Sequence, residues 1–117
     1  MGFPFLLPLL PQNSQVQTEL RDAIDYAYEN GCILVDAATD VWRTVVAPAA
    51  WRRTIAVAGS TINDGTWNGS SRGPQVDVSA PAWPVRRASV DRKGRYIYGV
   101  GDGTSFGTAM VAGCAAM

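Results

Sequence analysis

A serine stands at the entry to a small-residue segment near the end of the chain. Gly103-Thr104-Ser105 follows a glycine-rich loop and precedes a run rich in Gly and Ala. This pattern predicts a helix over residues 104–117 with Ser105 in its first turn. Free N–H groups and the helix dipole stabilise negative charge there, so Ser105 could serve as a nucleophile with its own N–H as an oxyanion donor. The spacing alone suits an ordinary helix cap as well, and caps are far commoner.

The chain of 117 residues contains no histidine. Histidine is the usual general base near neutral pH, because its pKa lies there. The chain therefore cannot supply a Ser-His-Asp triad by itself.

Two other functional classes are weakly supported. Residues 99–103 form a Gly-x-Gly-x-Gly loop, but its spacing is not that of a dinucleotide site, no lysine follows it, and Asp102 would repel a phosphate. Ten Lys and Arg balance ten Asp and Glu, which argues against nucleic acid or an anionic membrane as a partner. The pairs Arg52-Arg53 and Arg86-Arg87 are interpreted as solvated loop charge.

The rest of the chain has the pattern of an α/β domain. Residues 1–15 are a Pro-rich, irregular lead-in. A helix is predicted over residues 14–30, with Gly31 as a left-handed cap. The apolar face of that helix consists of Val16, Leu20, Ala23, Ile24, Ala27 and Tyr28.

Short apolar runs predict buried strands at residues 32–38 and 54–59, and a third strand at 76–79 that Pro81 stops. Residues 85–90 and 95–100 predict a hairpin around the turn 91–94. Such an order favours a mostly parallel sheet, but one with too few elements to cover both faces. Residues 16–117 are therefore expected to be part of a larger domain, truncated at both ends.

Neither the cysteines nor the N-terminal residues indicate the cellular compartment of the protein. Cys32 and Cys114 lie in apolar stretches and are predicted to be small buried residues rather than a disulfide. The apolar start of the chain is interrupted by three prolines, and no positive residue precedes it, so a signal peptide is not predicted.

Four collinear segments resemble the subtilisin-like serine peptidases. Residues 103–113 resemble their Gly-Thr-Ser-x-x-x-x-x-Val-Ala-Gly nucleophile motif, and residues 31–40 resemble their strand ending in Ala-Ala-Gly-Asn. Residues 48–60 and 70–81 resemble the Tyr-Pro-Ala…Ile-Ala-Val-Gly and Ser-x-x-Gly-Pro…Val-Asp-Val-x-Ala-Pro segments. The resemblance implies part of a three-layer subtilisin-like fold, with the nucleophile at the N-terminus of a helix. Family members are often secreted.

The resemblance also assigns roles to individual residues. Ser105 matches the nucleophile, and Asp40 matches the asparagine whose amide completes the oxyanion hole. Ala37, Ala38 and Thr39 match one wall of the primary specificity pocket, with Thr39 where the family usually has glycine. No cofactor is required, but some members hold a weak calcium or monovalent cation. Its ligands here would be the carbonyls of Ala49, Trp51 and Thr54, and the bond before Pro48 is expected to be cis.

Two departures predict that this chain is inactive by itself. The Asp and His of the family's triad have no counterpart in it, and Asp40 can only accept hydrogen bonds where an asparagine would donate. The resemblance thus implies a serine endopeptidase acting on peptides or proteins, with an incomplete site. The alternative is a non-catalytic chain that binds a peptide or a complementary chain along an open sheet edge.

Overall fold

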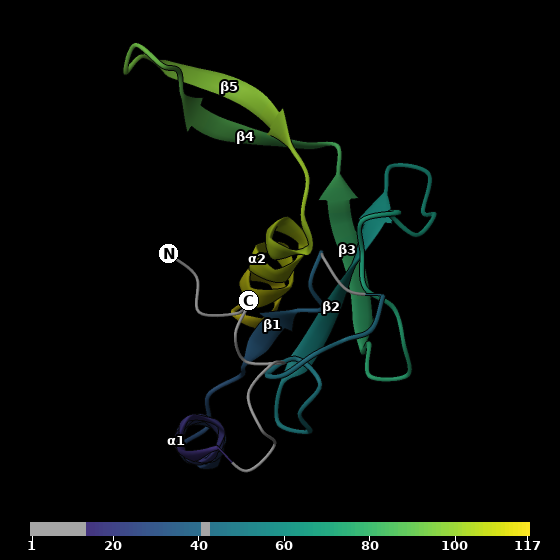
Figure 1. The fold of residues 1–117 in the computed structure, drawn as a ribbon. Coiled ribbons are helices and arrows are strands. Elements are labelled where there is room, and N and C mark those ends of the chain that lie inside the picture. The colour runs from purple at the N-terminus through teal and green to yellow at the C-terminus, as the bar shows by residue number, and fades with distance from the viewer. Residues whose placement is uncertain (1–13, 41–42) are drawn as a thin grey trace.

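The computed structural model describes residues 14–40 and 43–117 and forms an α/β arrangement (Figure 1). One helix precedes a parallel sheet, an antiparallel hairpin follows the sheet, and a second helix ends the chain. The elements are α1 (Gln15–Glu29), β1 (Val35–Ala37), β2 (Ile55–Thr61), β3 (Val78–Trp83), β4 (Val85–Val90), β5 (Tyr96–Gly101) and α2 (Thr104–Ala115).

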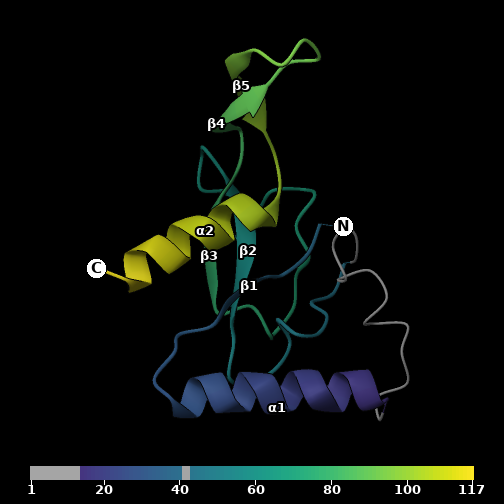
Figure 2. The same cartoon turned by 90° about the vertical axis from the view of Figure 1, so that its left-hand side faces the viewer.

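Helix α1 has the predicted ends, and most of its predicted apolar face is accessible. Ser14 caps its start by accepting from the Gln17 N–H at 3.4 Å, and Gly31 follows with a φ of 81°. Of the predicted apolar face, only Ile24 is buried, and Tyr28 remains 55% exposed. Little of the described chain covers this face, because α1 lies beside the N-terminal ends of the strands rather than across the sheet (Figure 2).

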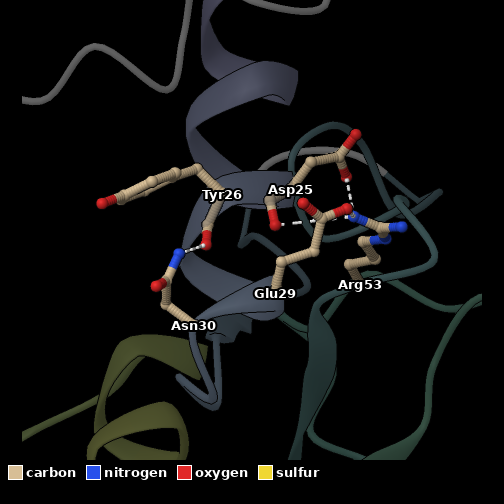
Figure 3. Close-up of polar contacts among 5 residues, drawn as sticks. All are labelled: Asp25, Tyr26, Glu29, Asn30 and Arg53. Atoms are coloured by element: carbon tan, nitrogen blue, oxygen red, sulfur yellow. Dashed lines mark hydrogen bonds and ion pairs between the residues drawn. The ribbon is translucent and has the colours of Figure 1, made fainter.

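Arg53 ties α1 to the loop before β2 (Figure 3). Its guanidinium lies 3.1 Å from Asp25 and 3.0 Å from Glu29, and it stacks over the Tyr28 ring at 5.1 Å from the centroid. The hydrogen bond that Arg53 donates to Glu29 is the main cause that raises the pKa of Arg53. Arg53 thus lies in a loop and is partly solvated, as interpreted from the sequence, but it also bridges two segments 24 residues apart.

The three strands β1, β2 and β3 pair in parallel in that order. Asp36 of β1 lies opposite Ala56 of β2, and Val57 lies opposite Val78 of β3. The strand β1 is shorter than predicted. The predicted stop at Pro81 was wrong, because β3 continues through it to Trp83. Proline lacks a ladder donor but is tolerated on an edge strand, and β3 is an edge among the described strands.

The predicted hairpin is confirmed. Strands β4 and β5 pair antiparallel, and the Asp91 carboxylate accepts hydrogen bonds from the N–H groups of Lys93 and Arg95 across the turn. These bonds and the Arg95 side chain lower the pKa of Asp91. The hairpin extends away from the parallel sheet (Figure 1), and Tyr96 at its tip is 93% exposed.

Helix α2 packs across one face of the parallel sheet (Figure 2). Gly107 allows this close approach, since a Cβ there would lie 3.1 Å from both the Cβ and the carbonyl oxygen of Ala80. The opposite face carries a small core made mainly of alanine. Its members are Ala38, Val45, Ala49, Ala56 and Ala58.

Both cysteines are exposed and unpaired, so the prediction that they are buried was wrong. Apolar neighbours in sequence misled that prediction, because Cys32 precedes β1 and Cys114 lies in the last turn of α2, where little of the described chain covers them. Within residues 14–40 and 43–117, no helix is long and apolar enough to cross a membrane.

Candidate nucleophile site at the start of helix α2

Ser105 is the second residue of α2 and is exposed. The helix begins where β5 returns to the C-terminal ends of the parallel strands, and the Gly103 N–H donates to the Ala82 carbonyl of β3 at 3.0 Å (Figure 1). No described residue accepts the Ser105 N–H or contacts its hydroxyl by a hydrogen bond. Both groups are therefore available to a ligand at this edge of the sheet.

The Asp40 side chain, which follows β1, also lies at the start of α2. Its Oδ1 accepts the Thr104 N–H at 2.7 Å and the Thr104 hydroxyl at 2.6 Å. Gly103, at the cap position of α2, offers no side-chain bond, so Asp40 satisfies a helix-start N–H from 64 residues away. A carboxylate at a helix N-terminus is also favoured by the helix dipole.

Both the backbone conformation at position 103 and the nearby Asp40 carboxylate favour a glycine there. Its φ is 143°, a conformation that residues with a side chain rarely adopt. A Cβ there would lie 3.1 Å from Asp40 Oδ2, the carboxylate oxygen that Thr104 does not bind. The second oxygen of Asp40 is thus directed along the entry to α2.

Thr39 has a φ of 83°, which is an outlier for a β-branched residue. Glycine adopts such a conformation without strain, in keeping with the family's usual glycine at this position. The Thr39 hydroxyl lies 2.8 Å from the Ser71 hydroxyl, and the Ser71 N–H donates to the Thr39 carbonyl at 2.9 Å. These two bonds hold the threonine in its strained conformation.

The predicted pocket wall is only partly accessible. Ala37 is half-buried in β1, whereas the Ala38 side chain is fully buried in the alanine core. Ala38 can thus offer a ligand only its backbone. The structure brings Ala37, Thr39, Asp40 and Ser105 to the C-terminal end of the sheet.

The loop whose carbonyls were predicted to bind a cation contains a hydrogen-bond donor of its own, the Thr54 hydroxyl. The Thr54 hydroxyl lies 2.9 Å from the Pro48 carbonyl oxygen, 3.4 Å from that of Ala49 and 2.8 Å from that of Trp51. A cation at the Ala49 and Trp51 carbonyls would have to compete with this buried hydroxyl. Among the described residues, no group of three or more His, Cys, Asp or Glu side chains could hold a metal ion. The Ala47–Pro48 bond is cis, as predicted, and so is Trp83–Pro84.

Sequence reasoning missed three contributors to this region. Thr104 joins Asp40 to the helix, Ser71 holds Thr39, and the Thr54 hydroxyl fills the carbonyl loop. Thr104 could have been suspected, since it directly precedes the serine. The other two contacts join segments 32 and 6 residues apart and leave no local pattern.

The parallel three-stranded sheet flanked by helices matches part of a subtilisin fold. A model described as Subtilase family matches residues 11–117, so the chain belongs to that family. The matched region covers all the described elements from α1 to α2.

Two relatives illustrate the extent of the match. Thermitase from Thermoactinomyces vulgaris is 34% identical over 100 residues, which are 84% of this chain and 34% of thermitase. The solved structure of the prenylagaramide maturation protease PagA superposes with a TM-score of 0.68 at 26% identity, covering 82% of this chain and 35% of PagA. The chain thus spans about a third of either relative.

Proposed function

We propose that this chain is the nucleophile-bearing part of a serine endopeptidase site, with Ser105 as the nucleophile and peptides or proteins as its substrate class. The observation that carries the proposal is the exposed Ser105 at the first turn of α2, with its N–H unbound by any described residue. Family membership supports the same role, because Gly103-Thr104-Ser105 stands where the family's nucleophile motif stands.

We further propose that the chain does not hydrolyse peptides by itself. It has no histidine to take the proton of the Ser105 hydroxyl. Asp40 also presents a carboxylate where a donor is needed, and a carboxylate near a developing oxyanion repels it. Removing one oxyanion donor typically raises the barrier by about 3–4 kcal/mol, and the negative charge adds to that cost.

The alternative, a chain that binds a peptide or a complementary chain without catalysis, is supported by the edge of β1 that no described strand covers.

A fluorophosphonate probe tests the proposal. Intact-protein mass spectrometry should detect no adduct on the chain alone, nor on Ser105→Ala. An adduct that forms on the chain and disappears in Ser105→Ala would disprove the inactivity while supporting the assignment of Ser105. An adduct that persists in Ser105→Ala would disprove the assignment itself.

A weak cation at the carbonyls of Ala49, Trp51 and Thr54 also stays a proposal. The position of the Thr54 hydroxyl argues against strong binding there. A calcium or potassium titration that raises the melting temperature of the chain would support such a site.

A further inference from the structure

The hairpin of β4 and β5 contains half of the basic residues of the chain. Residues 85–101 hold five of the ten Lys and Arg residues but only one of the ten acidic residues, Asp91. Asp91 is paired with Arg95 at 2.7 Å, so the other four basic side chains have no counter-charge within the hairpin. Strand β5 leads from them directly to the start of α2 (Figure 1). Positive charge concentrated beside an accessible site attracts anionic ligands.

Arg87 is the basic residue of the hairpin whose side chain extends toward α2. Arg87 lies opposite Gly99 in the hairpin register, so its side chain is on the same face as Gly101. A Cβ at Gly101 would lie 2.6 Å from Arg87 Nε and 3.0 Å from Phe106 Cζ. The Arg87 side chain and the Phe106 ring therefore meet over Gly101, where the absence of a side chain leaves room for both. Since Phe106 directly follows Ser105, Arg87 lies beside the first turn of α2.

No carboxylate of the chain pairs with Arg87. All ten acidic residues lie within residues 14–40 and 43–117, and none of them forms an ion pair with Arg87, which is exposed. Asp40 approaches the other end of the loop, with its Oδ2 beside Gly103. The helix dipole places partial positive charge at the start of α2, so it does not stabilise a cation there. Contacts within the described chain thus account for the packing of the Arg87 stem but not for its charge.

Arg86 provides an internal comparison. Adjacent residues of a strand point to opposite faces, so Arg86 points away from the face that holds Arg87 and Gly101. Both arginines lie in β4 rather than in the loop expected from the sequence, and both are exposed. Of the two, Arg87 is the one that packs over Gly101. A role at the start of α2 therefore belongs to Arg87, and Arg86 is its matched control.

We propose that Arg87 is a specificity-determining residue, which pairs with an acidic side chain one or two residues away from the peptide residue held at Ser105. This rests on the proposed function, because Ser105 is taken as the point at which the peptide is held. A guanidinium pairs with a carboxylate through two parallel N–H···O bonds, and neighbouring residues of an extended peptide are only about 3.3 Å apart. The site therefore prefers Asp or Glu near the residue at Ser105 and disfavours Lys or Arg there.

A disulfide tether at position 105 fixes the register of a test peptide. Ser105→Cys in a Cys32→Ser/Cys114→Ser background leaves one thiol in the chain. Acetylated and amidated peptides Xaa-Cys-Xaa, with Xaa as Glu, Gln or Lys, exchange with this thiol in a glutathione buffer. Intact-protein mass spectrometry measures the equilibrium fraction of adduct. The exchange constant should be about threefold higher for the Glu peptide than for the Gln peptide, and lowest for the Lys peptide.

Three variants separate the charge of Arg87 from its packing. The preference for Glu over Gln should disappear in Arg87→Gln, persist in part in Arg87→Lys and remain unchanged in Arg86→Gln. Added salt should weaken the preference in the parent chain, because both charges are exposed. A purely structural role would lower the exchange constants of all three peptides alike. Circular dichroism checks the fold, and Arg87→Lys, which retains the charge and the long stem, guards against misfolding of Arg87→Gln.

Three results would each overturn the proposal: equal exchange constants for the three peptides in the parent chain, a preference for Glu that survives in Arg87→Gln, or an equal loss of preference in Arg86→Gln. The tether forms whether or not the Ser105 hydroxyl attacks a peptide, so a failure of the proposed nucleophile leaves this measurement interpretable. Equal exchange constants, in turn, would leave the fluorophosphonate test of Ser105 unaffected.

Discussion

Replacing Asp40 with asparagine should make Ser105 more reactive at a small cost in stability. The Thr104 N–H can donate only to an oxygen, so it fixes the orientation of the new side chain. Oδ1 of the asparagine stays on the Thr104 N–H, where Oδ1 of Asp40 now lies at 2.7 Å. The amide nitrogen then takes the place of Oδ2, beside Gly103 at the entry to α2. A donor thus replaces a negative charge at the proposed oxyanion position.

The two consequences differ in size. Removing the carboxylate from the helix N-terminus should lower the free energy of unfolding by about 0.3–1 kcal/mol, since the neutral hydrogen bond remains. Adding one oxyanion donor should lower the barrier to attack by about 3–4 kcal/mol, which corresponds to a rate increase of about 10²–10³. The gain in reactivity therefore exceeds the loss of stability.

Fluorophosphonate labelling with imidazole as an external base provides the assay, because the chain has no histidine. Intact-protein mass spectrometry follows the adduct, and urea unfolding measures stability. Asp102→Asn is the matched control, since it removes the same charge next to Gly103 without touching Thr104. Faster labelling in Asp40→Asn that is absent in Asp102→Asn and in Asp40→Asn/Ser105→Ala supports the reasoning. Equal labelling in the two single variants, or no increase in Asp40→Asn, refutes it.

Three further predictions concern the scaffold around the site. Gly107→Ala should lower the free energy of unfolding, measured in urea, by about 1–2 kcal/mol, because the added Cβ would press on Ala80. In the same helix, the Cβ of Gly113→Ala has no neighbouring atom within 4 Å, so this variant should raise the free energy of unfolding by up to about 1 kcal/mol. Equal effects of the two substitutions would contradict the packing of α2. Thr54→Val should cost about 1–3 kcal/mol in the same assay and Thr54→Ser much less, since only valine removes the hydroxyl that the loop carbonyls share; a cost for serine equal to that for valine would contradict this role. Burial raises the pKa of Asp36 in the folded chain above the ordinary 3.8, so the stability of the natural chain falls as pH rises from 3.8 through the folded pKa. The melting temperature of Asp36→Asn should therefore rise relative to that of the natural chain over this pH range. A difference in melting temperature that does not depend on pH would contradict the burial of the carboxylate.

The sequence predicted those elements whose local pattern and packing agree. The hairpin followed from a turn that Asp91 closes within five residues, and α1 followed from Ser14 and Gly31 at its ends. The burial of α1 could not be predicted, because a periodic apolar face shows that a surface can be buried but not that a layer covers it. The same limit explains the exposed Cys32 and Cys114.

The roles of the candidate site residues stay predictions, and their contacts could not be predicted from the sequence. Ser105, Asp40 and Thr39 were identified by segments that resemble the family's motifs. The bonds that fix them join residues such as Asp40 and Thr104, which lie 64 apart in sequence and carry no shared pattern. Thr39 is an exception, because the family usually has glycine there and the φ of 83° is one that glycine adopts without strain.

Hydrolysis of a fluorogenic peptide by the purified chain tests the central claim most directly. The natural chain, Ser105→Ala and buffer should release the fluorophore at the same rate, because the chain has a serine at the nucleophile position but no histidine to activate it. A rate for the natural chain that clearly exceeds that of Ser105→Ala would show that Ser105 is activated by groups other than those considered above, and would contradict the proposed inactivity.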